Sequence, residues 1–408
     1  MQNNSRSYPS ILFKSALVLL LASIPFSRAL LSISTGLIVI SAIWEFILNK
    51  PKVHFKNKYL YCLAGLVIFC LLDGFRADSH IEWARLVELK LPLLLLPLSI
   101  LIFNKHLNER LITNFTIVFC MSVSAATLGS IINYGMNYKA INALVLQSKN
   151  VPIMGGMHHI TFSVFCAFAS LVSFVLAVKL KSALFWLLAV VNLLGLHILT
   201  ARTGLVGFYF AAFILGIVYL VHHRPKTHYL VGVGLAIIIA PLVAFWGIGS
   251  FHNRVLNTWE DIKVIRAQKD VNYQSMGMRL EASKTAISIA KKHPIIGVGF
   301  SNIKGEMARQ YTEDNSTLFL ENRIMPHNQF IMEATVHGII GFVILLLYFA
   351  FPLFAPFTKL PLVFLCLWSL LFFASFFECL FDRQHGILLV SLFWFLYIDF
   401  KPEGVKNK

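Results

Sequence analysis

Three residues stand where their side chains could serve a reaction: Arg202 in LTARTGL, Arg279 in SMGMRLEASKTA and His327 in PHNQF. A general base at pH 7 requires a neutral imidazole. A guanidinium is always charged and binds phosphate oxygens through two parallel hydrogen bonds. Two arginines can neutralise a diphosphate leaving group without a metal. The three residues together therefore predict a site in which a histidine removes a proton while two arginines hold a diphosphate.

Each of these residues also has an ordinary structural interpretation. Arg202 lies between two apolar runs and could be an arginine that extends to the membrane surface. Arg279 could form a surface salt bridge with Glu281 or Glu260. His327 could be a capping or interface histidine. It precedes a predicted helix, however, and the positive end of a helix dipole disfavours the imidazolium form, which favours the general base.

Further candidates for the site are His159, Asn328 and Arg323, and Asn328 could also cap the helix that follows it. Hard cations need several oxygen ligands, and the acidic clusters of the predicted outer loops are too sparse to require one. We therefore expect no metal and no other cofactor. A polar patch is interpreted as structural pairing; it consists of Glu378, Asp382, Arg383 and Gln384.

The elements that must position these residues are membrane helices. The chain has 408 residues, of which 57% are hydrophobic and only 13% charged, and its mean hydropathy is +0.72. Soluble domains are about a quarter charged, whereas a membrane helix needs about 20 mostly apolar residues. Such runs predict about twelve spans, at 11–25, 29–48, 58–73, 86–103, 111–133, 158–178, 182–200, 203–222, 228–249, 328–351, 359–378 and 385–400.

The short connections between these spans indicate the orientation, because cytoplasmic loops are enriched in lysine and arginine. One side carries most of the basic residues: Arg6, Lys14, Lys50, Lys52, Lys56, Lys58, Lys105, Arg110, Lys179, Lys181, Arg224, Lys226, Lys359, Lys401, Lys406 and Lys408. We expect this side and both termini to be cytoplasmic. The chain then divides into spans 1–9 (1–249), a large, mostly helical outer loop (250–327), and spans 10–12 with a tail (328–408).

The formal net charge of +16 could indicate nucleic-acid binding. The charges instead separate the apolar runs, as membrane topology requires, and no RNA- or DNA-binding motif is present. We therefore expect membrane lipid around the chain and no nucleic-acid partner.

Several short motifs resemble the O-antigen ligase and polymerase superfamily of bacterial inner membranes. They are TARTGLVGF, GMRLEASKTAISIAKKHPIIGVGFSNIK and PHNQFIMEATVHGIIGF, within about 195–345. The resemblance implies a multi-helix fold of the GT-C type and a glycan donor on undecaprenyl diphosphate. It implies a lipid A–core oligosaccharide as acceptor and metal-independent, inverting glycosyl transfer. Arg202 and Arg279 would hold the diphosphate, and His327 would deprotonate the acceptor hydroxyl.

Other functions remain open at this point. An O-antigen polymerase would share the donor and the arginines, and a ligase that glycosylates periplasmic proteins would differ only in its acceptor. A lipid-linked glycan flippase or other transporter belongs to a different class. Transporters more often have internal repeats and broken helices at mid-membrane, and they do not need a large outer loop that carries a histidine.

Overall fold

The computed structural model describes residues 8–51, 53, 57–155, 157–223, 227–267, 270–356 and 360–398. In this part of the chain the regular structure is entirely helical. The first half comprises α1 (Tyr8–Ser23), α2 (Arg28–Asn49), α3 (Lys58–Leu72), α4 (His80–Lys90), α5 (Pro92–Phe103), α6 (Glu109–Met136), α7 (Tyr138–Leu146), α8 (His159–Leu180) and α9 (Ala183–Leu199). The second half comprises α10 (Arg202–His223), α11 (Thr227–Gly247), α12 (Gly249–Arg266), α13 (Ser275–Lys292), α14 (Ile303–Glu313), α15 (Gln329–Val336), α16 (Gly338–Ala350), α17 (Leu362–Ala374), α18 (Gln384–Leu388) and α19 (Trp394–Ile398).

Each of the twelve predicted spans falls on one or more of these helices. Within the described residues, six helical stretches are long and apolar enough to cross a membrane, and five shorter helices are also apolar. The chain is thus a polytopic, all-helical membrane protein, while the number of twelve crossings stays a prediction. The basic residues Arg6, Lys52, Lys56, Arg224, Lys226, Lys359, Lys401, Lys406 and Lys408, on which the predicted orientation partly rests, lie outside the described residues.

Helix α8 lies at the centre of the molecule. It packs against α6, α9, α10 and α17, and most of its side chains from Ile160 to Ser173 are fully buried. A helix that is apolar on every face is typical of a protein core or of a membrane span, and here the neighbouring helices bury it. Phe165 and Phe168 of α8 make tilted or edge-on ring contacts with Phe119 of α6 and with Phe393. The N-terminal end of α8, at His159, is half-buried and is carried by this enclosed helix.

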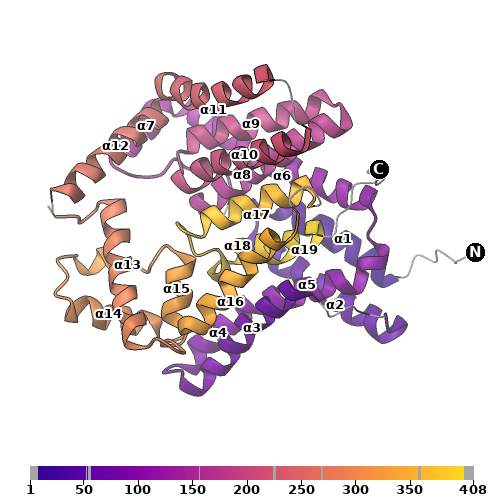
Figure 1. Cartoon of the computed structure of the whole chain (residues 1–408), viewed down its shortest axis with the longest axis horizontal. Helices are drawn as coiled ribbons and strands as arrows, with labels where there is room; N and C mark the ends of the chain where they lie inside the picture. Colours follow the sequence, from indigo (N-terminus) through magenta and orange to yellow (C-terminus); the bar gives the residue numbers. More distant parts are fainter. Residues whose placement is uncertain are drawn as a thin grey trace, which may run out of the picture.

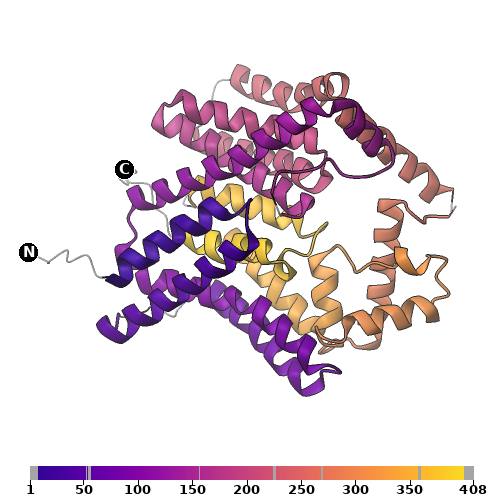
Figure 2. The same cartoon turned by 180° about the vertical axis from the view of Figure 1, so that it is seen from behind.

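The segment between α11 and α15 contains α12, α13 and α14, which lie on one side of the molecule, away from α1 and α2 (Figures 1 and 2). The predicted helix MRLEASKTAISIAKK is present as α13. Ala282, Ala286 and Ile289 of α13 form a small hydrophobic core of their own with Tyr311 of α14 and Val336 of α15. The segment that comprises α12, α13 and α14 is called the outer segment below. Because α15 contributes to this core, the outer segment is packed onto the helices that follow it.

The HPIIGVGF segment attaches the outer segment to α3. Arg76 donates from Nη1 to the Gly297 carbonyl at 2.8 Å and from Nη2 to the Ile296 carbonyl at 2.9 Å. Asp73, which is 1% exposed, pairs with Arg76 and accepts a hydrogen bond from the Phe300 N–H at 2.8 Å. Buried backbone groups must be paired, and here two charged side chains pair them. This motif therefore holds the outer segment in place, and we assign it no chemistry.

Gly338, at the break between α15 and α16, allows this attachment. Its φ of +64° belongs to the left-handed region, and an added Cβ would lie 2.2 Å from the Ile295 carbonyl oxygen. We expect Gly338→Ala to lower the thermal unfolding temperature markedly, because the backbone conformation alone costs about 1–2 kcal/mol in any other residue and the clash adds to that.

Gly305→Ala is the matched control for this prediction. Gly305 lies within α14, and an added Cβ would meet nothing within 4 Å. Alanine favours a helix over glycine by about 0.8–1 kcal/mol, so this variant should be as stable as the parent or slightly more stable. Equal unfolding temperatures for the two variants, measured in the same detergent, would contradict the proposed role of the turn.

Candidate active site

Arg202 is positioned by a very short turn between α9 and α10. Thr200 follows α9 with a φ of 56°, in the left-handed region, and α10 begins at Arg202. The guanidinium thus stands at a helix N-terminus, where the helix dipole adds to its positive potential. Arg202 Nη2 lies 3.3 Å from Asp261 Oδ2 of α12, but its buried Nε–H has no partner among the described residues. An unpaired buried donor calls for an acceptor, such as an anion.

Arg254 of α12 joins Arg202, and the sequence did not indicate it. Its Nε donates to Thr200 Oγ1 at 3.3 Å and its Nη2 to the Lys149 carbonyl at 2.8 Å. Burial and the charge of Arg202 lower the pKa of Arg254 to about 10, although Asp261 opposes the shift. Arg254 therefore remains charged at pH 7, and its repulsion from Arg202 would be relieved by a bound anion.

Arg279 lies in the first turns of α13 and belongs to the same electrostatic group. Its Nη1 donates to the Phe377 carbonyl at 3.4 Å. Burial lowers the pKa of Arg279, and so do the charges of Arg202 and Arg383, whereas Glu378 raises it. The salt bridge that the sequence suggested is absent among the described residues, because Glu281 pairs with Lys284 and Glu260 with Lys263. Arg202, Arg254 and Arg279 are referred to below as the arginine cluster.

His327 immediately precedes α15, as predicted. Asn328 is the N-cap of this helix, and its Oδ1 accepts a hydrogen bond from the Ile331 N–H at 3.0 Å. The Gln329 N–H donates to the Ser375 carbonyl at 2.8 Å, which ties the start of α15 to the end of α17. His327 is therefore held against residues 375–383, although these lie about fifty positions away along the chain.

This contact brings Glu378 to His327. His327 Nδ1 lies 3.3 Å from Glu378 Oε2, while Arg383 Nε donates to Glu378 Oε1 at 2.7 Å. Burial raises the pKa of Glu378, but the hydrogen bond from His327 and the charges of His327, Arg383 and Arg279 outweigh it and lower the pKa to about 2. An ionised carboxylate only accepts hydrogen bonds. Nδ1 of His327 therefore carries the proton of this hydrogen bond, and Nε2 on the opposite side of the ring has no hydrogen bond to the described residues.

The sequence suggested only structural pairing for the polar patch that contains Glu378 and Asp382, but Glu378 has a further role. Asp382 does form a structural pair, because it bonds Lys90 of α4. Glu378, in contrast, pairs with both Arg383 and His327, and the charge of Arg279 contributes to lowering its pKa. No local motif indicated this, since the contact joins two segments that only the packing of α15 against α17 brings together.

The further candidates are placed differently. His159 is the first residue of α8. Burial and the charges of Arg383, His327 and Arg279 lower the pKa of the neighbouring His158, whereas Glu378 raises it. The two histidines therefore border the same site. Asn328 serves as the helix cap. Arg323 bonds the Leu318 carbonyl and Thr312 within the outer segment, and the structure does not bring it to His327. Within the described residues, no three His, Cys, Asp or Glu side chains are arranged to hold a metal ion.

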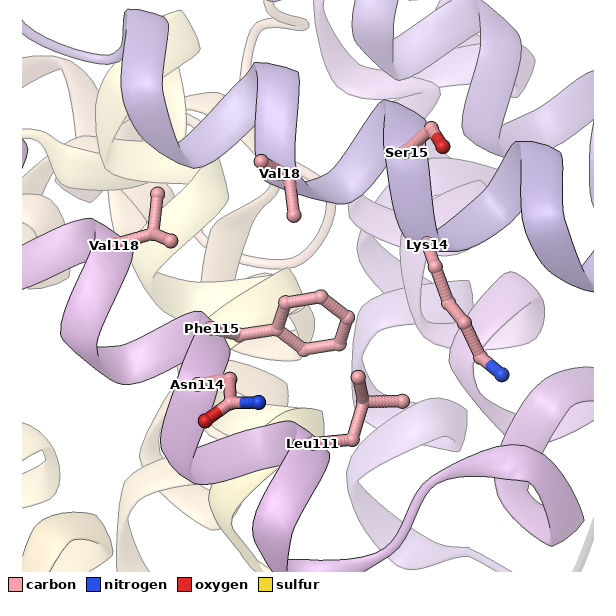
Figure 3. Close-up of a pocket in the computed structure, with 7 residues that line it drawn as sticks. All are labelled: Lys14, Ser15, Val18, Leu111, Asn114, Phe115 and Val118. Atoms are coloured by element: carbon pink, nitrogen blue, oxygen red, sulfur yellow. The ribbon is translucent and has the colours of Figure 1, made fainter.

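A cavity of about 350 Å³ adjoins His327, and Glu378 and Arg383 also line it. A second cavity, of about 390 Å³, lies between α1 and α6, where the ring of Phe115 stands between the two helices (Figure 3). Its lining includes Lys14, Val18 and Leu111 but none of the candidate site residues. Of these two cavities, the one at His327 therefore bears on the chemistry of the site.

The structure defines a polytopic helical membrane protein with a histidine and several arginines gathered at the ends of its helices. A protein-family model described as O-antigen ligase matches residues 184–346, the segment that carries Arg202, Arg254, Arg279 and His327. This match confirms the resemblance to the O-antigen ligase and polymerase superfamily over this part of the chain. It supports a ligase- or polymerase-type function in lipopolysaccharide biosynthesis. A comparison with curated proteins finds no match.

Proposed function

We propose that this protein is an O-antigen ligase that transfers a glycan from undecaprenyl diphosphate to a hydroxyl of the lipid A–core oligosaccharide. The observation that carries the proposal is the contact at 3.3 Å between His327 and an ionised Glu378. The charge of Arg279 acts on Glu378, and the charge of Arg202 acts on Arg279, so the arginine cluster lies close to this pair. A histidine base beside a concentration of positive charge suits a reaction in which a hydroxyl loses a proton while a diphosphate departs.

In the proposed reaction, Nε2 of His327 accepts the proton of the acceptor hydroxyl. The hydroxyl oxygen forms a bond to the anomeric carbon of the donor glycan, and the bond from that carbon to the diphosphate oxygen breaks. The electron pair of the broken bond remains on undecaprenyl diphosphate, whose charge the arginine cluster stabilises. Attack opposite the leaving group inverts the anomeric configuration. The proton on His327 then passes to solvent, and no metal takes part.

The proposal includes a location. The donor has its lipid tail in the bilayer and its diphosphate at the surface, so Arg202, at the start of α10, would lie at the outer surface of the bacterial inner membrane. Residues 250–327 would then be periplasmic, both termini cytoplasmic and the fold of the GT-C type. The predominance of basic residues in the connections on the other side supports this orientation.

Glu378 acts as a positioning residue in this scheme. We expect Glu378→Gln to lower kcat about 10- to 100-fold, because a hydrogen bond to a charged group is worth about 1.5–3 kcal/mol. A purified transfer assay measures this effect, and an unchanged kcat would contradict the role of Glu378.

Loss of the gene, followed by analysis of the cell's glycans, tests the function. A ligase predicts long glycans on the undecaprenyl carrier and lipid A–core without O-antigen. An O-antigen polymerase predicts single repeat units on lipid A–core, and a flippase predicts lipid-linked glycan retained on the cytoplasmic side. Either of these two results would overturn the proposal. In purified form the enzyme should retain its activity in EDTA, and loss of activity on chelation would overturn its metal independence.

A further inference from the structure

The cavity beside His327 contains charges that the reaction described above does not use. Five parts of the chain line it: α4, the start of α14 with the residues just before it, the residues before α15, Met332 of α15, and residues 378–383. No member of the arginine cluster lines it. His327 thus borders a second space, separate from the place where a diphosphate would be held, and the partner that gives up a proton to His327 must come from such a space.

Most charges in this cavity are neutralised within the protein. Asp382 pairs with Lys90, and Glu378 pairs with Arg383 and His327. Arg85 of α4 and Lys304 of α14 form no ion pair among the described residues, and both side chains are exposed. Glu82, one turn before Arg85, is the one lining acid in the described chain without an ion pair. Arg85 and Lys304 therefore leave an excess of positive charge.

The backbone around these two residues is held in place. The Asp78 N–H donates to Asn302 Oδ1 at 3.1 Å, and Asn302 Nδ2 donates to the Arg76 carbonyl at 2.8 Å. Trp83 Nε1 donates to the Cys70 carbonyl at 2.9 Å, which fixes α4 to α3. These bonds tie the start of α4 to the start of α14. Arg85 and Lys304 are thereby attached to a common frame, so the backbone that carries them need not be ordered when an anion binds.

We propose that this cavity binds the acceptor glycan, and that Arg85 and Lys304 select an acceptor with an anionic group, phosphate or carboxylate, near the hydroxyl that attacks. This inference rests on the proposed function, since it takes His327 as the base. Arginine binds either anion through two hydrogen bonds, and lysine adds a point charge. Glu82 opposes the same anion, so its removal should strengthen binding.

The test uses the full-length protein in lipid nanodiscs with a lipid-linked donor and core oligosaccharide as acceptor. The acceptor is offered in three forms: intact, with its phosphates removed, and with its carboxylates amidated. For the double variant Arg85→Gln/Lys304→Gln, we expect the KM for the intact acceptor to rise about tenfold or more, with kcat and the donor KM unchanged. Whichever treatment abolishes the difference between parent and variant identifies the anion.

Two further variants sharpen the test. Arg266→Gln/Lys291→Gln removes one arginine and one lysine from exposed positions of the outer segment that do not line the cavity, and its acceptor KM should equal that of the parent. Glu82→Gln should lower the acceptor KM, an effect that a misfolded variant cannot imitate. Equal acceptor KM values for the parent and the Arg85/Lys304 variant would overturn this inference while the parent still transfers glycan. If the parent transfers nothing to any acceptor form, the proposed function itself fails.

Discussion

Replacement of His327 by alanine should reduce glycan transfer by about 10²–10⁴-fold, the usual contribution of a general base, while the protein remains inserted and folded. The expected loss is large because the acceptor hydroxyl would have to attack with its proton still in place. Glu378 and the capping residue Asn328 do not compensate, since Glu378 has a pKa of about 2 and is a very weak base at neutral pH. A purified transfer assay with a lipid-linked donor measures the effect.

His293→Ala is the matched control for this variant. His293 lies in the same outer segment, at the end of α13, and its exposed side chain makes no hydrogen bond or ion pair among the described residues. We expect the control to keep the activity of the parent. Transfer by the His327 variant at the parent rate would rule out the general-base assignment, whereas an equal loss in both variants would point to a stability effect, which thermal unfolding in detergent detects.

Replacement of Arg202 by lysine should lower kcat by about 10²–10³-fold, the usual cost of losing one donor to a developing negative charge. Lysine keeps the positive charge but cannot supply the Nε–H, which is buried and unpaired in the structure. It also cannot bind a phosphate through two parallel hydrogen bonds. The defect should therefore appear in kcat and in the affinity for undecaprenyl diphosphate, with the acceptor KM unchanged.

Arg266→Lys provides the same chemical change at an exposed position of α12, outside the arginine cluster, and should leave all kinetic constants unchanged. If Arg202→Lys turned over as fast as the parent, a simple positive charge would be sufficient at this position. The bidentate clamp would then have to be assigned to Arg254 or Arg279.

The sequence by itself determined those features of the protein that depend on neighbouring residues. Apolar runs long enough to cross a bilayer predicted most of the apolar helices, because the lipid requires all backbone groups to be bonded within each segment. They did not predict α4 or α7 as separate helices, or the breaks between α15 and α16 and between α18 and α19. Helix formers between Ser275 and Lys292 predicted α13. The cap at Asn328 and the short turn before Arg202 were likewise visible, since caps and turns use residues only a few positions apart.

Only the tertiary structure decided which side chains meet. Glu378 lies 51 positions from His327 and Arg254 lies 52 from Arg202, and their proximity depends on how α12, α15 and α17 are rotated and at what depth they pack. Ridge-into-groove packing of whole helix surfaces sets these quantities, and no short motif records them. For the same reason the glycines of HPIIGVGF could be noticed in the sequence, but their attachment to Asp73 and Arg76 could not.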